Sequence, residues 1–267
     1  MMRTEIMRVL NTPPTDLVRS LLQRPETMEL PPIDPRHSDV PLLRGAEIAA
    51  VYHNHRVAGD FYEFLRVGLS RVLFGMFDVA GRREDTREIL IAAQKTFRTL
   101  APTLFAGEDL NEAEAMIQLS HEINRTILEA ADGVRSCPAF IGCYNEDLGT
   151  VCYTNAGHTP ALLRDNSGIT QLEASGLPLG IFSHATHSAS TCALGPGAVL
   201  LIVSRGMVEA EHDHQEFGLE GVKEGFQKTT AQTAQDLCVA ILRSAEQFME
   251  ALPAHNDVTA LAVLRTR

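Results

Sequence analysis

The sequence lacks the features that mark several large classes of protein. Its 267 residues carry a formal net charge of −11, so there is no surplus of positive charge to attract nucleic acid or an anionic membrane surface. The five cysteines include no Cys-x-x-Cys pair, and their odd number and scattered positions argue against a disulfide framework and a zinc knuckle. We therefore expect neither nucleic acid nor a membrane as a partner.

Long apolar runs are missing as well. The longest run surrounds residues 199–203, far short of the roughly 20 residues that cross a bilayer. Arg3, Glu5 and Arg8 interrupt the first ten positions, which argues against a signal peptide. Apolar residues make up 45% and charged residues 21%, as is usual for a water-soluble domain. We expect a cytoplasmic protein whose cysteines are buried free thiols.

Proline is concentrated near the N-terminus, where it divides the chain. Residues 25–41 contain five prolines, which exclude a regular helix or a central strand there. Residues 16–22 have the pattern of one short amphipathic helix. We expect a lead-in arm over residues 1–42 and a single domain over residues 43–267, which is long enough for one sizeable core.

The rest of the chain predicts an α+β fold. Strands are expected at residues 46–52, 72–79, 139–144, 151–155, 161–164, 191–194, 199–203 and 258–264. Long helices are expected at residues 86–100, 110–130 and 233–250. Closely spaced strands with hairpin-like turns indicate antiparallel sheets, and helices grouped in blocks indicate that they cover the faces of those sheets. On the first helix, we expect Lys95 and Arg98 to be solvated.

Four stretches stand out as candidate sites, three of them next to an expected strand and one with an aspartate directly after a glycine. The buried strand over 199–203 runs into Ser204-Arg205-Gly206, and strand ends that open into a glycine turn often carry chemistry. Acidic residues stand in the other three, at Gly59-Asp60, at Asp78-Val79-Ala80-Gly81 and at Asn256-Asp257. An isolated aspartate at a strand end is more often a turn former or a helix cap, so no single stretch decides the function.

Taken in order, the motifs resemble the SpoIIE-like branch of the PPM-type metal-dependent protein serine/threonine phosphatases. The family pattern is roughly G-G-D-F-Y-D, D-V-S-G-K-G, N-A-G-H-P-P, G-x-P-L-G, T-D-G-x-x-E and D-D-x-T. This chain has Ala58-Gly59-Asp60-Phe61-Tyr62-Glu63, Asp78-Val79-Ala80-Gly81, Asn155-Ala156-Gly157-His158-Thr159-Pro160, Gly176-Leu177-Pro178-Leu179-Gly180, Ser204-Arg205-Gly206-Met207-Val208-Glu209 and Asn256-Asp257-Val258-Thr259. The resemblance covers about residues 43–267. It implies a four-layer α-β-β-α sandwich, with two stacked antiparallel sheets flanked by helices.

The resemblance also implies a site. Family members hold two Mg²⁺ or Mn²⁺ ions, and a water molecule bound to them attacks the phosphorus atom. Two metal ions of this kind lower the pKa of the bound water. Carried over to this chain, Asp78 would bridge the two ions and the backbone carbonyl of Val79 would bind the second one. Asp60 would lie beside them, bound directly or through water.

At several positions the chain departs from the family. Arg205 stands where T-D-G has its aspartate, and Asn256 stands where D-D-x-T has its first aspartate, so two ligands of one ion are lost. Asp257 is expected not to replace the second of them, because neighbouring side chains of a strand point to opposite faces. Residues 82–84, Arg-Arg-Glu, replace the glycine turn of D-V-S-G-K-G.

Arginine at position 205 is costly for a metal site. A guanidinium about 4 Å from a divalent ion costs roughly 8 kcal/mol at an effective dielectric constant near 20, and arginine does not lose its proton. We therefore expect at most one weakly bound Mg²⁺ or Mn²⁺, near Asp60, Asp78 and Val79. Arg205 either binds a phosphate group in a bidentate pair or pairs with Asp60 or Asp78 and fills the vacated place.

Two functions remain open. The first is a pseudophosphatase, or a weakly active enzyme, that binds a phosphoserine- or phosphothreonine-bearing partner in bacterial signalling. The second is a working Mg/Mn-dependent phosphatase that removes such a phosphate. The sequence favours the first, because Arg205 and Asn256 replace ligands of the same ion. The resemblance suggests an anti-sigma-factor antagonist, or a similar phosphoprotein, as the partner.

Two histidine-bearing stretches have both a functional and a structural interpretation. His158 either touches a phosphate group or holds its loop by hydrogen bonds. Residues 211–214, Glu-His-Asp-His, are either a metal-binding tract or an exposed polar loop after a strand. The structural interpretation is favoured for both.

Overall fold

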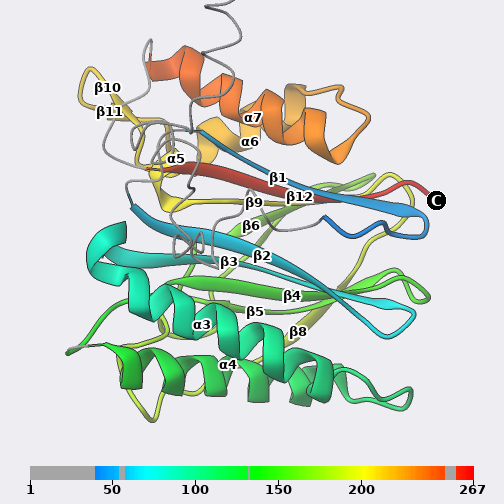
Figure 1. Cartoon of the computed structure of the whole chain (residues 1–267). Coiled ribbons are helices and arrows are strands. Elements are labelled where there is room, and N and C mark those ends of the chain that lie inside the picture. The colour runs from blue at the N-terminus through cyan, green and yellow to red at the C-terminus, as the bar shows by residue number, and fades with distance from the viewer. Residues whose placement is uncertain (1–39, 54–57, 132, 250–256) are drawn as a thin grey trace, which may run out of the picture.

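The computed structural model describes residues 40–53, 58–131, 133–249 and 257–267. Two five-stranded antiparallel sheets are stacked face to face in this part of the chain, with long helices on the outer face of each (Figure 1). The expected α+β sandwich of four layers is therefore confirmed. The expected helix at residues 16–22 and nearly all of the expected arm lie outside the described residues, so the division of the chain at residue 42 stays an expectation.

The first sheet contains the C-terminal strand. Its order is β1 (Ala46–His53), β12 (Val258–Arg265), β9 (Val199–Val203), β6 (Ala161–Asp165) and β7 (Gly168–Leu172). Helices α6 (Gly218–Lys228) and α7 (Ala234–Met249) cover its outer face (Figure 1). A one-turn helix α5 (Arg205–Val208) and a small hairpin of β10 (Glu211–His212) and β11 (Gln215–Glu216) follow β9.

The second sheet is built mainly from consecutive hairpins. Its order is β2 (Ala58–Val67), β3 (Arg71–Arg82), β4 (Ala139–Asn145), β5 (Thr150–Ala156) and β8 (Ser190–Ala193). Helices α3 (Arg83–Leu104) and α4 (Glu112–Ala130) cover its outer face (Figure 1). No helix among the described residues is long and apolar enough to cross a membrane.

The core has three apolar layers, one between the sheets and one beneath each pair of helices. Side chains of a strand alternate between the two faces of its sheet. In β3, Leu73 and Phe77 belong to the layer under α3 and α4, whereas Phe74 and Met76 belong to the layer between the sheets. This alternation fixes the direction in which each polar residue at the strand ends points.

Every strand and long helix expected within the described residues is present, to within a few residues at its ends. The structure adds elements that the sequence patterns did not predict, namely β2, β7, β10, β11, α5 and α6. Helix α3 also continues beyond the expected end at Leu100 to Leu104, with Pro102 inside its last turn.

Candidate functional site

Asp60 and Asp78 form the centre of the candidate site. They are direct partners across the β2–β3 pair, next to a β-bulge between Ala58 and Gly59. Phe61 belongs to the layer under the helices, so alternation turns Asp60 toward the space between the sheets, and the same holds for Asp78 beside Phe77. The two residues are only 7% and 6% exposed. Two facing carboxylates repel each other, so this pair lowers stability unless a cation or a proton compensates it.

The surroundings of Asp60 favour its protonated form. Burial is the largest cause that raises the pKa of Asp60 well above its usual value, and the charges of Asp78 and Asp257 raise the pKa further. The positive charge of Arg205 opposes this effect only in part. Cys137 lies close by, and burial together with the charges of Asp78 and Asp60 raises the pKa of its thiol. The centre is therefore an acidic, poorly hydrated cluster.

Ser204 links two strands of the first sheet at the end that contributes to the site. The residue is fully buried, and its hydroxyl donates to the backbone oxygen of Asp257 at 3.2 Å. The same hydroxyl accepts the backbone N–H of Thr259 at 3.0 Å, and the Ser204 N–H donates to the Thr259 oxygen at 2.9 Å. These bonds fasten the end of β9 to the start of β12. Arg205 and Asp257 are thereby held at the same end of the sheet.

Asp257 corrects one expectation from the sequence. Leu261 and Val263 of β12 belong to the layer between the sheets, and alternation continued back along the chain places Thr259 and Asp257 on that same side. Asp257 is 2% exposed, and its charge raises the pKa of Asp60, so it lies near the acidic pair. Alternation therefore does not turn Asp257 away from the acidic pair, while the expectation that Asp257 does not replace the lost ligand stays a prediction.

Arg205 lies beside the acidic pair. Its Nε atom is 3.5 Å from Oδ2 of Asp78 and 3.7 Å from Oε2 of Glu209, one turn later in the chain. The Arg205 side chain remains 56% exposed, so part of the guanidinium faces solvent. Of the two roles considered for Arg205, the structure shows the one in which the arginine pairs with Asp78. An arginine therefore supplies positive charge at the edge of the cluster.

The structure brings together three of the site residues expected from the sequence, Asp60, Asp78 and Arg205. Val79 is adjacent to them, but its side chain is buried in the layer under α3 and α4, so only its backbone is available to a ligand. Asn256 lies outside the described residues. Ser204 and Asp257 were quoted in the motifs without a role, and the signal that could have found them is a polar side chain placed just beyond a buried strand.

The described side chains do not fit the two-ion centre that the family resemblance implies. Among them, no group of three or more histidine, cysteine, aspartate or glutamate side chains is arranged to hold a metal ion. Arg205 places a guanidinium nitrogen 3.5 Å from the carboxylate that would bridge the ions. A cation at Asp78 would be repelled by this guanidinium, which cannot lose its proton.

His158 supports its loop. Its backbone N–H donates to Oδ1 of Asn155 at 2.8 Å, and its Nδ1 lies 3.1 Å from the backbone oxygen of Thr159. The ring is 3% exposed, and burial lowers the pKa of His158. These contacts agree with the structural interpretation. The Glu-His-Asp-His tract at residues 211–214 lies in and around the β10–β11 hairpin, where His214 pairs with Glu211 at 3.4 Å on the surface.

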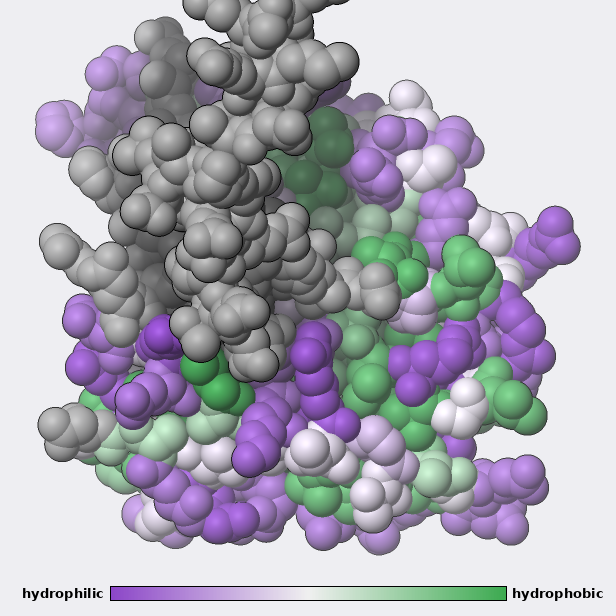
Figure 2. Space-filling view, in the orientation of Figure 1, coloured by the Kyte–Doolittle hydropathy of each residue, from purple (hydrophilic) through white to green (hydrophobic). Residues whose placement is uncertain are grey.

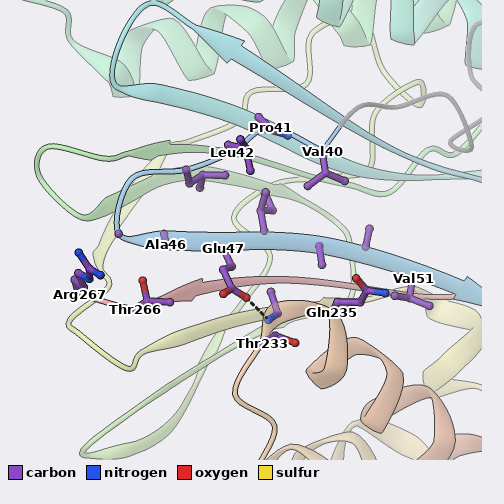
Figure 3. Close-up of a pocket in the computed structure, with 16 residues that line it drawn as sticks. Val40, Pro41, Leu42, Ala46, Glu47, Val51, Thr233, Gln235, Thr266 and Arg267 are labelled. Atoms are coloured by element: carbon purple, nitrogen blue, oxygen red, sulfur yellow. Dashed lines mark hydrogen bonds between the residues drawn. The ribbon is translucent and has the colours of Figure 1, made fainter.

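A separate groove of about 900 Å³ runs along β1, the edge strand of the first sheet. Figure 3 shows Val40, Pro41 and Leu42 on one side of this strand and Thr233 and Gln235 on the other. The one acidic residue among the groove's lining residues is Glu47, which accepts the backbone N–H of Ala234 at 3.0 Å and so caps α7. The groove does not include the acidic cluster, and we place the candidate site at Asp60 and Asp78.

Two antiparallel sheets lie between helices, and acidic residues lie at one end of the sandwich. This fold and this site together are those of the PPM-type phosphatases. The family model for stage II sporulation protein E (SpoIIE) matches residues 70–266. This match covers most of the chain, and the chain belongs to the SpoIIE family.

Known proteins similar to this chain agree with the assignment. The chain is 22% identical over 198 residues to protein IcfG of Synechocystis sp.. This match covers 67% of the chain but 31% of IcfG, so the chain spans about a third of that relative. The crystal structure of the RsbU and RsbW domains of a Mycobacterium tuberculosis protein superposes with a TM-score of 0.67 at 22% identity, over 85% of this chain and 61% of the other. RsbX in complex with magnesium superposes with a TM-score of 0.61 at 14% identity, over 85% and 98%. At these identities the superpositions show the fold alone.

Proposed function

We propose that this chain is a pseudophosphatase, or at most a weakly active enzyme, that binds a phosphoserine- or phosphothreonine-bearing partner protein in bacterial signalling. The observation that carries the proposal is the 3.5 Å contact between Arg205 Nε and Asp78 Oδ2. It puts a fixed positive charge beside the carboxylate on which the family's metal chemistry depends. Membership of the SpoIIE family supports a phosphoprotein partner, for which an anti-sigma-factor antagonist is the working example.

The loss of metal follows from charge. A divalent ion at the usual bonding distance from Asp78 would stand a few ångströms from the Arg205 guanidinium, at a cost of roughly 8 kcal/mol for a separation near 4 Å. Swinging the half-exposed arginine away lowers this cost, but it also breaks the pairs with Asp78 and Glu209. The proposal therefore includes at most one loosely held Mg²⁺ or Mn²⁺ near Asp60, Asp78 and the Val79 carbonyl.

Binding of the partner's phosphate would use the same arginine. Arg205 contacts Asp78 through Nε, and its side chain is 56% exposed at the edge of the site. A guanidinium matches the geometry of a phosphate group in a bidentate pair. A phosphate would compete with Asp78 and Glu209 for this charge, so the proposed affinity is moderate and depends on further contacts with the partner.

The test compares a phosphoserine peptide with its unphosphorylated twin in EDTA, by fluorescence anisotropy with the full chain. We expect the phosphopeptide to bind more tightly, Arg205→Ala to remove the difference, and Arg205→Lys to keep only part of it. Release of inorganic phosphate from the phosphopeptide is measured in parallel with Mn²⁺, with Asp78→Asn as the blank. Equal binding of the two peptides contradicts phosphate recognition, whereas rapid Mn²⁺-dependent phosphate release that Asp78→Asn abolishes contradicts a pseudophosphatase or weakly active enzyme.

A working Mg/Mn-dependent phosphatase is the second candidate. The observation that favours it is the position of Asp257, which is 2% exposed and whose charge raises the pKa of Asp60. A third carboxylate near the pair offers partial compensation for the ligand replaced by Arg205. The release assay separates the two candidates, with Asp257→Asn as an added variant. A working phosphatase that depends on Asp257 loses rapid phosphate release in this variant, whereas a pseudophosphatase or weakly active enzyme has little or no release to lose.

A further inference from the structure

The end of the sandwich remote from the acidic cluster exposes large apolar side chains. Leu42, Leu69 and Leu148 are 92%, 90% and 68% exposed, more than most other large apolar residues in the described part of the chain. Leu69 is in the β2–β3 turn and Leu148 is in the β4–β5 turn. Figure 1 shows both turns at the right-hand end of the sheets, and Figure 2 shows hydrophobic and hydrophilic residues next to one another there.

These leucines stand on a rigid base. Glu146, whose side chain is fully buried, accepts hydrogen bonds from Arg66 at 2.8 Å and from the Arg44 Nε at 3.1 Å. Arg66 also donates to the backbone oxygen of Leu42, and both arginines reach the backbone oxygen of Leu69. One buried carboxylate thus joins the two hairpin turns to the segment before β1. Exposed apolar side chains on a support of this kind are typical of protein interaction sites.

A groove of about 1110 Å³ begins between the two leucine-bearing turns and extends to the start of α4. Leu69 and Leu148 lie on its rim, and its floor is neutral, because Arg71 pairs with Glu112 at 2.7 Å. Asn145 also donates to Glu112 at 2.8 Å, which gives the partly buried carboxylate a second partner. The floor is therefore fixed in shape, and the groove's recognition properties depend on its rim.

Glu108 and Asp109, in the loop between α3 and α4, give the rim its charge. Both line the groove and both are exposed, whereas the carboxylate of Asp147 on the opposite side is paired with Arg44 at 2.9 Å. The rim thus combines two exposed leucines with two exposed carboxylates. A partner complementary to it carries apolar side chains next to lysine or arginine.

We propose that this groove is a docking site for a short basic, apolar segment of a partner protein, in which leucine-like side chains pack on Leu69 and Leu148 and lysine or arginine faces Glu108 and Asp109. The site is independent of the acidic cluster. Val67 follows Asp60 by seven positions in β2, or about 23 Å at the rise of a strand. A partner can occupy the groove while its phosphorylated residue is elsewhere, so the inference does not depend on catalysis or on phosphate recognition.

The test uses a labelled synthetic peptide of about twelve residues in which leucines recur between lysines, with a twin that carries glutamate for every lysine. We expect the basic peptide to bind the full chain more tightly than its twin. The affinity is expected to fall at least about tenfold in Leu69→Ser/Leu148→Ser and in Glu108→Lys/Asp109→Lys. All four positions are exposed, so these variants fold. Hydrogen exchange is expected to slow in residues 68–71 and 106–113 when the peptide binds.

Matched controls carry the same chemical changes at exposed positions elsewhere. They are Val134→Ser/Leu177→Ser and Glu88→Lys/Glu173→Lys, and both are expected to bind the peptide like the parent. Equal weakening in the controls, or no binding by the parent, overturns the docking site. A concentration-dependent dimer that only Leu69→Ser/Leu148→Ser abolishes also overturns it, because the surface then joins two copies of this chain. None of these results bears on phosphate release, which tests the proposed function separately.

Discussion

Arg205 Nε lies 3.5 Å from Asp78 Oδ2, so a cation of the chain itself stands beside the carboxylate that would bridge two metal ions in this family. The two residues come from different sheets, since Asp78 belongs to β3 and Arg205 follows β9. Ser204 holds the Arg205 end of β9 against β12. The contact therefore depends on the packing of the sandwich rather than on a local turn.

Restoring the lost carboxylates tests whether only the metal site has been lost. The double change Arg205→Asp with Asn256→Asp adds three negative charge units at the two positions that the family resemblance aligns with the lost ligands. Without metal the variant is expected to melt below the parent, because crowded carboxylates repel. With Mn²⁺ its melting temperature is expected to rise and Mn²⁺-dependent ester hydrolysis to appear, because the ion binds only the folded state.

Each single change controls for the double variant. Either one leaves an ion short of a ligand, so each is expected to give a much smaller Mn²⁺-dependent rise in melting temperature. If the double variant gains neither stability nor activity with Mn²⁺, then positions 205 and 256 do not correspond to the family's ligands.

Ser204→Ala is expected to destabilise the chain by about 2 kcal/mol, because the N–H of the buried residue Thr259 loses its acceptor. The measurement is urea unfolding. Ser244→Ala is the control, since the Ser244 hydroxyl only bonds the Ala240 oxygen within α7, and its removal is expected to cost almost nothing. Equal effects of the two changes would show that Ser204 does not fasten β9 to β12.

Arg98→Met is expected to cost about 2 kcal/mol. The Glu63 side chain is 2% exposed, and it accepts from Arg98 at 2.9 Å and from Gln94 at 2.6 Å, so removal of the arginine leaves a buried charge poorly compensated. Lys95→Met changes an exposed neighbour on the same helix and is expected to be almost neutral. Thermal unfolding of both variants checks the difference, and a neutral Arg98→Met contradicts it.

Glu146 gives stability a defined dependence on pH. Burial disfavours its charged form, but hydrogen bonds from Arg66 and Arg44 outweigh burial and lower its pKa from 4.5 to about 2. The pKa of Glu146 is lower in the folded state than in the unfolded state, so ionised Glu146 stabilises the folded state. This contribution is complete above about pH 4.5 and is lost as the pH falls toward 2. Glu146→Gln is therefore expected to be less stable than the parent by about 2 kcal/mol at pH 7.

The difference between parent and Glu146→Gln is expected to shrink as pH falls from 4.5 to 2. Glu129→Gln serves as the control, because Glu129 is a 62% exposed partner of Arg125 and is expected to change stability little at any pH. A gap between parent and Glu146→Gln that stays constant down to pH 2 would show that the arginines do not hold Glu146 ionised.

The sequence predicted the fold well because alternating strands and helical spacing reflect burial directly. Helix α6 was missed because Gly218, Gly221 and Gly225 weaken its helical pattern. Strand β2 was missed because its polar residues interrupt the apolar pattern, and with it the buried partner of Arg98 was missed. The expectation that Arg98 is solvated holds only in part for that reason, since its side chain is 38% exposed but pairs with the buried Glu63 of β2.

At the site, the motifs identified Asp60, Asp78 and Arg205, which the structure brings together. They did not show which way Asp257 faces. Alternation shows that neighbouring side chains of a strand point to opposite faces, but it does not show which of them points toward the other sheet. That direction depends on how β12 packs in the sandwich. Leu261 and Val263 face the other sheet, which settles the direction of Asp257, and no local pattern in the sequence contains that information.

Calorimetric titration of the full parent chain with Mn²⁺ is the most direct measurement of whether Arg205 replaces a metal ion. The permanently charged Arg205 guanidinium beside Asp78 leads us to predict no tight site and at most one ion bound in the millimolar range. Arg205→Ala is expected to bind Mn²⁺ more tightly than the parent, because the repelling charge is gone. Two tight Mn²⁺ sites in the parent chain would contradict the replacement of metal by arginine.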